Sequence, residues 1–297
     1  MENSDLLREL LHKKDILKVG GAFDAMSAKL IEINNFDAIW TGSFAISATH
    51  ALPDASILTM TDFLNVSSSI TDSCKIPVIA DCDTGFGGPS NVSHTVKKFE
   101  SVGVAAICIE DKTFPKQNSL LKNGTHQLIS EKDFVAKIMA AKEAKVNKNF
   151  MIIARTEALI AETGMEDALA RATAYEAAGA DAILIHSKKT TPDEIFEFSK
   201  IWNGNIPLVV VPTTYPSVSI DDLIKNNFKM IIYANQTLRA SYTAMNNVLK
   251  QLDTSKRITD IKQEISSMED IFSLQEMYEI KNQEKIIDEN LKKMGYI

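Results

Sequence analysis

The sequence has few cysteines, no long apolar run and no excess of basic residues, and each shortage excludes a class of protein. The three cysteines, Cys74, Cys82 and Cys108, lack the spacing of a metal site, and an odd number does not fit a disulfide framework. We therefore expect buried, unpaired thiols in a reducing compartment. Because no stretch has the character of a signal peptide or a membrane span, we expect a cytoplasmic protein.

The charge balance argues against a polyanionic partner. The 297 residues include 32 Lys and Arg against 39 Asp and Glu, so the net charge is -7 and no basic field is available for a nucleic-acid backbone. A small anion held by one or two local cations is compatible with this charge. We expect a small-molecule ligand, and neither a nucleic acid nor a membrane as partner.

Eight short apolar runs alternate with helical patterns along most of the chain. The runs lie at residues 16–20, 37–40, 77–80, 105–109, 151–154, 182–185, 207–211 and 229–233. Among the helices, we expect one capped near Ser90 or Asn91 and one that ends at Gly179. The runs are continuously apolar, as in parallel strands that are covered on both faces. The pattern predicts an α/β fold, a (β/α)8 TIM-type barrel, although a doubly wound sheet shares the same alternation.

The chain contains no linker, repeat or low-complexity segment that would divide it, so we expect residues 1–297 to form a single domain. The last segment, residues 265–297, carries apolar residues near its start and is then dense in Glu and Lys. This segment is predicted to form extra C-terminal helices, packed outside the barrel or on a neighbouring subunit.

The apolar run at residues 77–80 is followed by two carboxylates and a glycine turn. In a strand, side chains i and i+2 share a face, so we expect Asp81 and Asp83 to point the same way and Cys82 to point opposite. Two carboxylates at a strand end suit Mg²⁺, which prefers oxygen ligands and keeps several waters. Alternatively, Asp83 caps the turn and Asp81 is a solvated strand terminus.

Other predicted strands also end in polar side chains, and the carboxyl ends of the strands form the active-site face of such barrels. These residues are Trp40, Gly42 and Ser43 after the second run, Glu110 and Asp111 after the fourth, Arg155 and Glu157 after the fifth, and His186 after the sixth. Each has a simpler interpretation: Arg155 pairs with Glu157, and Trp40 and His186 belong to the core. Together they indicate a site, because clustered carboxylates are costly unless a cation compensates.

The segment 112–127 is long, polar and without periodicity, which is typical of a functional loop. We interpret it as a lid that closes over an anionic, oxygen-rich ligand through Lys116, Asn118 and Ser119. A disordered surface loop is the alternative, which the apolar anchor Phe114-Pro115 disfavours.

At these residues the sequence resembles the phosphoenolpyruvate mutase and isocitrate lyase superfamily, and within it the phosphoenolpyruvate mutase branch. The resemblance runs from about residue 19 to residue 275. It includes Asp81-Cys-Asp-Thr-Gly-Phe-Gly87, Glu110-Asp-Lys-Thr-Phe-Pro-Lys-Gln-Asn-Ser119, Ala154-Arg-Thr-Glu-Ala158 and Ile185-His-Ser-Lys-Lys189. It implies a (β/α)8 barrel whose last helix is exchanged between the subunits of a homodimer or homotetramer.

The resemblance also implies an activity and the residues that carry it. The activity is an isomerisation of phosphoenolpyruvate and phosphonopyruvate, which forms a carbon to phosphorus bond in phosphonate biosynthesis. Mg²⁺ would be held directly by Asp81 and through water by Asp54, Asp83 and Glu110. The substrate would meet Trp40, Gly42, Ser43, Phe44, Asn118, Arg155 and His186, and the catalytic set would be Asp54, Lys116, Asn118, Ser119, Arg155 and His186.

Two lid features separate the branches of this superfamily. Carbon to carbon lyases carry a Lys-Lys-Cys-Gly-His type motif, whereas this lid reads Lys116-Gln-Asn-Ser-Leu120 without a cysteine, so a lyase is disfavoured. Phosphonopyruvate hydrolases typically have Thr where this chain has Asn118, so we expect a mutase and keep the hydrolase as the alternative. A catalytically silent barrel is disfavoured because every carboxylate of the metal cluster is present.

One departure concerns the turn after the second strand. Mutases usually read Trp-x-Ser-Gly there, whereas this chain reads Trp40-Thr41-Gly42-Ser43. The hydroxyl is displaced by one position, so the expected substrate contacts are the backbone N–H groups of Gly42 and Ser43.

Overall fold

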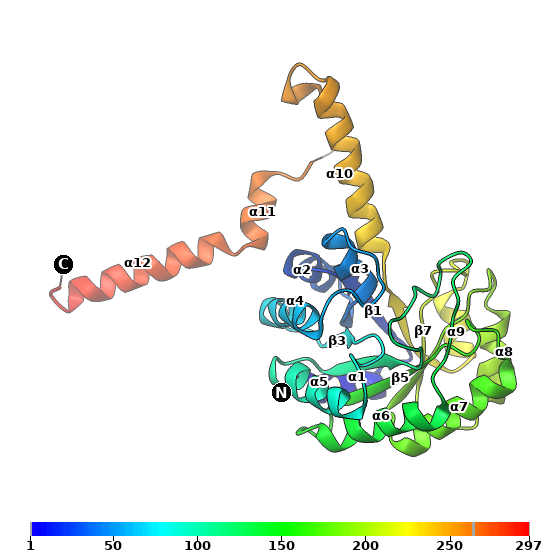
Figure 1. The fold of residues 1–297 in the computed structure, drawn as a ribbon. Coiled ribbons are helices and arrows are strands. Elements are labelled where there is room, and N and C mark those ends of the chain that lie inside the picture. The colour runs from blue at the N-terminus through cyan, green and yellow to red at the C-terminus, as the bar shows by residue number, and fades with distance from the viewer. Residues whose placement is uncertain (1, 263–264, 297) are drawn as a thin grey trace. The chain divides into compact units, whose positions relative to one another are not determined.

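A closed barrel of eight parallel strands organises the computed structural model, which describes residues 2–262 and 265–296 (Figure 1). The strands are β1 (Leu17–Ala22), β2 (Ala38–Thr41), β3 (Val78–Asp81), β4 (Ala106–Glu110), β5 (Met151–Thr156), β6 (Ala182–Ile185), β7 (Leu208–Val210) and β8 (Phe228–Tyr233). Neighbours in sequence pair in parallel, and β8 pairs with β1. This closure confirms the predicted (β/α)8 barrel and excludes the open, doubly wound sheet.

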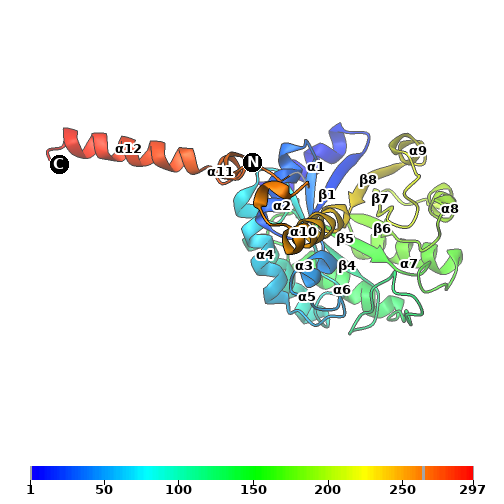
Figure 2. The same cartoon turned by 90° about the horizontal axis from the view of Figure 1, so that it is seen from above.

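Helices surround the strands (Figure 2). They are α1 (Asn3–Lys13), α2 (Ala25–Ile33), α3 (Ser43–Thr49), α4 (Met60–Ser73), α5 (Pro89–Ser101), α6 (Glu131–Ala144), α7 (Met165–Ala178), α8 (Asp193–Ile201) and α9 (Ile220–Lys225). As predicted, α7 ends at Gly179, whose φ of 106° is left-handed. Helix α5 begins at Pro89, one or two residues before the predicted cap at Ser90 or Asn91, and proline suits the first turn of a helix. Asn91 lies inside this turn, where its side chain accepts from the N–H of Gly88.

The core consists of two apolar layers, one inside the barrel and one between the strands and the helices. Ile79, Cys108, Ile153 and Leu184 belong to the inner layer, whereas Ala80, Cys82, Ile109 and Ile185 belong to the outer layer. All three cysteines are buried and free, as predicted. Successive residues therefore alternate between the barrel interior and the helices, as the geometry of a strand requires.

Beyond the barrel, α10 (Gln236–Thr254), a 3-10 turn (Ile258–Asp260), α11 (Met268–Leu274) and α12 (Met277–Lys293) confirm the predicted C-terminal helices. The chain divides into two compact units, residues 1–238 and 239–297, and the start of the C-terminal extension at residue 265 stays a prediction. The single-domain organisation of residues 1–297 stays a prediction. Among the described residues, none of the helices is both long and apolar enough to cross a membrane.

Candidate active site

Strand alternation brings four charged or polar side chains to one end of the barrel. Two residues beyond Ile79, Cys108, Ile153 and Leu184, which face the interior, lie Asp81, Glu110, Arg155 and His186. The register places Glu110 directly beside Arg155 and Asp81 beside Cys108. Apolar side chains fill the barrel interior, so the last inward-facing side chain of each strand lies above them at the carboxyl end of the barrel. Side chains at these positions can contact a ligand.

Four acidic residues, Asp54, Asp81, Asp83 and Glu110, form what we call the carboxylate cluster. The side chain of Asp54 is 5% exposed, and the other three residues are buried, which excludes a solvated strand terminus at Asp81. Asp83 joins the carboxylate cluster, but the prediction that it does so as part of the strand was wrong. Strand β3 ends at Asp81, and Asp83 lies in the following turn with a φ of 49°. Its N–H donates to Asp81 Oδ1 at 3.2 Å, and its carbonyl accepts from the N–H of Glu110 at 2.8 Å.

Lid residues and Ser43 engage this cluster directly. Lys116 Nζ lies 2.6 Å from Asp83 Oδ1 and 2.9 Å from Asp54 Oδ1, and it donates to Ser43 Oγ at 2.9 Å. Ser43 Oγ in turn donates to Asp81 Oδ2 at 2.9 Å. Asn118 Nδ2 donates to Asp54 Oδ2 at 2.8 Å. Residues of the predicted lid are therefore part of the site.

A nearby positive charge would stabilise the carboxylate cluster. Burial raises the pKa of Asp83 to about 7; Lys116 opposes this shift, and the neighbouring carboxylates add to it. Glu110 Oε1 is buried without a hydrogen-bond partner in the described part of the chain. These oxygen donors fit Mg²⁺, which binds few carboxylates and keeps water ligands. In residues 2–262 and 265–296, no group of three acidic, His or Cys side chains is placed to hold a metal directly.

A second set of side chains, which we call the Arg155 cluster, lies beside the first: Lys112, Ser119, Arg155, Glu157 and His186. Arg155 Nε lies 2.5 Å from Glu157 Oε1 and 3.3 Å from Glu110 Oε2, so it joins the two clusters. The predicted Arg155 and Glu157 pair is therefore present. His186 Nδ1 lies 2.9 Å from both Glu157 Oε1 and Arg155 Nη2.

Glu157 is the common acceptor of the Arg155 cluster, and the sequence indicated only one of its partners. Besides Arg155 and His186, it meets Lys112 Nζ at 2.9 Å and accepts from Ser119 Oγ at 2.6 Å. Burial opposes ionisation of Glu157, but Arg155, His186 and Lys112 hold its pKa well below the usual range. When His186 is neutral, the Arg155 cluster has two positive charges, on Lys112 and Arg155, and one negative charge, on Glu157. The net positive charge suits an anionic ligand.

The sequence did not indicate a buried hydrogen-bonded group around Asp111, which holds the backbone of Glu157. Asp111 Oδ1 accepts from the N–H of Glu157 at 2.9 Å, and Asp111 Oδ2 accepts from the Tyr175 hydroxyl at 2.6 Å. Arg171 Nη1 lies 3.3 Å from the same carboxylate and donates to the carbonyl of Ile129, two residues after the predicted lid. The acidic residue next to Glu110 was visible in the sequence, but its partners on α7 lie too far along the chain to be inferred.

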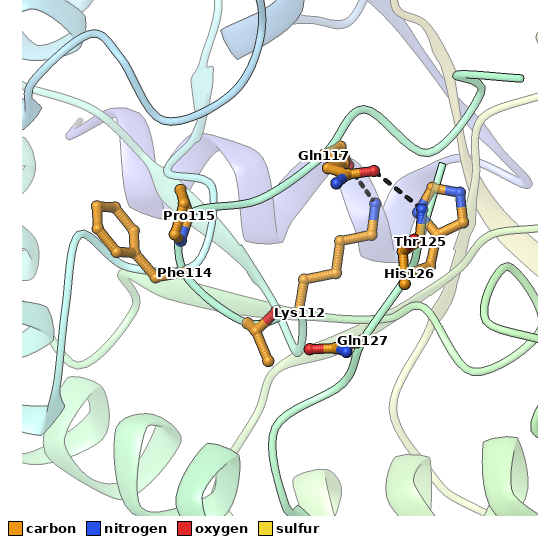
Figure 3. A pocket seen from close by; sticks show the side chains of 8 residues that line it. Lys112, Phe114, Pro115, Gln117, Thr125, His126 and Gln127 are labelled. Atoms are coloured by element: carbon orange, nitrogen blue, oxygen red, sulfur yellow. Dashed lines mark hydrogen bonds between the residues drawn. The ribbon is translucent and has the colours of Figure 1, made fainter. Parts of the chain in front are cut away.

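A partly open pocket of about 320 Å³ lies within the predicted lid, between one arm at residues 112–117 and a second arm at residues 125–127 (Figure 3). Lys112 Nζ reaches the carbonyl of Gln117 at 3.0 Å, and Gln117 Oε1 accepts from the N–H of Thr125 at 2.9 Å. The N–H of Thr113 donates to the carbonyl of Gln127 at 2.9 Å. The two arms are thus joined near their base and again near the tip.

Three predicted substrate residues lie apart from this hydrogen-bonded network. Trp40 packs in the inner core, and Gly42 lies against it, because a Cβ there would meet Trp40 Nε1 at 3.0 Å. Phe44 lies on α3 with 43% of its surface exposed. Ser43 is part of the network, but its hydroxyl and its N–H both contact Asp81. Substrate contacts of these four residues stay predictions.

Comparison with known proteins identifies the family. A family model described as phosphoenolpyruvate phosphomutase matches residues 7–253. The chain belongs to this family. It is 41% identical over 276 residues to a phosphonopyruvate hydrolase from Variovorax sp. (strain Pal2), covering 93% of this chain and 95% of the relative. It is 38% identical over 279 residues to a phosphoenolpyruvate phosphomutase from Tetrahymena pyriformis, covering 94% and 93%.

Solved structures of the phosphoenolpyruvate phosphomutase family agree with the fold. A phosphoenolpyruvate phosphomutase from Streptomyces platensis subsp. rosaceus has a TM-score of 0.93 and 42% identity, covering 95% of this chain and 98% of that one. A phosphonopyruvate hydrolase solved with oxalate and Mg²⁺ has a TM-score of 0.90 and 39% identity, covering 96% and 99%. The protein is an enzyme of the phosphoenolpyruvate mutase and isocitrate lyase superfamily, whose members include mutases, a hydrolase and lyases.

Proposed function

We propose that the enzyme is a phosphoenolpyruvate mutase, an isomerase that interconverts phosphoenolpyruvate and phosphonopyruvate in the cytoplasm. Phosphonopyruvate hydrolysis is the alternative. Overall similarity does not separate the two activities, because the hydrolase and the mutase relatives have similar identities to this chain, 41% and 38%. The residue that favours the mutase is Asn118.

The contacts of Asn118 support this choice. Its Nδ2 donates to Asp54 Oδ2 at 2.8 Å, and its Oδ1 accepts from the N–H of Leu120 at 3.0 Å. An amide has two donor hydrogens, so one stays available for a phosphoryl oxygen while the other holds Asp54. The shorter threonine of the hydrolases has one donor and leaves space into which a water can enter as nucleophile. We infer that Asn118 keeps the transferring group in place and the site dry.

The Arg155 cluster would bind the phosphoryl group. Burial and the charge of Arg155 lower the pKa of His186 against the opposing effect of Glu157, which favours the neutral imidazole with a single N–H to donate. Arg155 supplies positive charge, and Ser119 brings a hydroxyl from the lid. Phosphoryl transfer needs mainly such positioning and charge stabilisation, since its transition state is loose. Enclosure by the lid would exclude the water that turns transfer into hydrolysis.

The carboxylate cluster would hold Mg²⁺, directly through Asp81 and through water by Asp54, Asp83 and Glu110. The related hydrolase was solved with Mg²⁺ and oxalate, which supports this assignment. Bound there, Mg²⁺ would supply the positive charge that stabilises a pyruvate enolate. Incubation of the purified enzyme with phosphonopyruvate and Mg²⁺ tests the proposed function: a mutase forms phosphoenolpyruvate, whereas a hydrolase releases phosphate.

We also propose a homodimer or homotetramer that exchanges C-terminal helices. Tyr242, Met245, Leu249 and Leu252 recur at helical spacing on α10 and are 44–68% exposed. Met26, Leu30 and Ile33 form a second exposed stripe on α2. Stripes of this kind mark interaction surfaces, because a lone chain would leave them in water. A second copy of the chain would cover them.

The oligomer is tested by charging the α10 stripe. We expect the wild-type enzyme to have the mass of a dimer or tetramer by light scattering after size exclusion. Leu249→Asp should shift it to monomer, since burying an unpaired carboxylate in an apolar interface costs several kcal/mol, ~3 or more. Asn247→Asp, at an exposed position of the same helix, should leave the mass unchanged. A wild-type monomer would contradict helix exchange.

A further inference from the structure

Lys116 already places a cation among the oxygens proposed to surround the metal. Its ammonium is within 2.9 Å of Asp83 Oδ1, Asp54 Oδ1 and Ser43 Oγ, and its side chain is 5% exposed. The ammonium lies between the carboxylates of Asp54 and Asp83, so it offsets part of the repulsion within the carboxylate cluster.

The same contacts hold the lid down. Besides the ammonium, the N–H of Lys116 donates to Ser56 Oγ at 3.1 Å, and Asn118 binds Asp54. Asp54 and Asp83 are thus both the attachment points of the lid and proposed partners of the waters around Mg²⁺. One carboxylate oxygen cannot give its full charge to two cations, and an ammonium and a divalent ion a few ångströms apart repel each other.

We propose that Lys116 and Mg²⁺ compete for Asp54 and Asp83, so that Mg²⁺ alone releases the lid. This rests on the proposed magnesium site. An anionic substrate adds negative charge beside the metal, which allows the ammonium to return and the lid to close. The order of events that follows is metal first, then substrate, then closure. Because coupling between two sites is reciprocal, closure must weaken metal binding by the same factor by which the metal weakens closure, so removing the ammonium should strengthen metal binding.

The test measures Mn²⁺ binding by calorimetry without substrate, in the wild-type enzyme and two variants. Lys116→Met keeps the length of the side chain and removes its charge, and we expect it to bind Mn²⁺ on the order of tenfold more tightly. Lys122→Met removes an exposed charge from the same lid and should bind like the wild type. Equal or weaker binding by Lys116→Met, beside measurable wild-type binding, overturns the competition and leaves the magnesium site standing. No binding by any of the three overturns both.

A second measurement uses the wild-type enzyme alone, so it does not depend on a variant that folds. Chymotrypsin cleavage after the exposed Leu121, identified by mass spectrometry, reports lid opening. We expect cleavage to be several-fold faster in Mg²⁺ than in EDTA, and slow again when oxalate is added to the Mg²⁺. Cleavage that is unchanged or slower in Mg²⁺ alone contradicts the proposal.

Discussion

Replacing Asp81 with alanine should lower turnover by about a thousandfold or more. Asp81 is the inward carboxylate at the end of β3 and the proposed direct ligand of Mg²⁺. Loss of a catalytic metal removes several kcal/mol of charge stabilisation from the transition state, and each ~1.4 kcal/mol is a factor of ten in rate. The fold should survive, because removing one of four clustered carboxylates relieves repulsion. Steady-state kinetics and a thermal melt measure the two effects.

The matched control is Asp72→Ala, which removes an exposed carboxylate from α4 and should change neither quantity. Asp81→Asn adds a sharper comparison, because it keeps the shape of the side chain and loses its charge. It should be nearly as inactive as Asp81→Ala. If Asp81→Ala kept more than about a tenth of wild-type turnover, equivalent to ~1.4 kcal/mol, the metal assignment would be wrong.

Replacing Asn118 with threonine should lower isomerisation about a hundredfold and open a slow hydrolytic reaction. A hydroxyl on a shorter side chain loses either Asp54 or the phosphoryl oxygen, and a misplacement of about 1 Å costs roughly 10²-fold in rate. Inorganic phosphate should then appear from phosphonopyruvate, since water enters the vacated space. A phosphate assay beside an assay for phosphoenolpyruvate follows both products.

The control for Asn118→Thr lies in the same lid. Asn123 has a φ of 60°, which glycine adopts without strain, so Asn123→Gly removes a lid amide and keeps the backbone. This variant should isomerise at the wild-type rate and release no phosphate. An Asn118→Thr enzyme with unchanged isomerisation would remove the basis for preferring the mutase.

The barrel and the inward ends of its strands follow from local patterns. Each apolar run specifies a strand, and alternation by twos carries Ile79 to Asp81 and Leu184 to His186. Asp83 shows where such reasoning ends, because the strand stops before it and a left-handed turn places its carboxylate. No periodicity describes that turn.

Contacts between the lid and the barrel could not be derived from the sequence. Asn118 and Asp54 are 64 residues apart, and each lies in a loop whose path depends on the whole fold. The same applies to Tyr175, which reaches Asp111 from the helix that follows the next strand. The types of residue at the strand ends were enough to predict a charged site. The role of Glu157 as common acceptor was not predictable, because three of its partners come from the ends of three different strands.

Product analysis with phosphonopyruvate tests the proposed mutase activity most directly. The purified wild-type enzyme, incubated with phosphonopyruvate and Mg²⁺, is followed over time by ³¹P NMR, which separates the substrate, phosphoenolpyruvate and inorganic phosphate. We predict that the phosphonopyruvate signal is replaced mainly by that of phosphoenolpyruvate. Stoichiometric phosphate and pyruvate, with no phosphoenolpyruvate signal at any time, would contradict the mutase and establish the hydrolase.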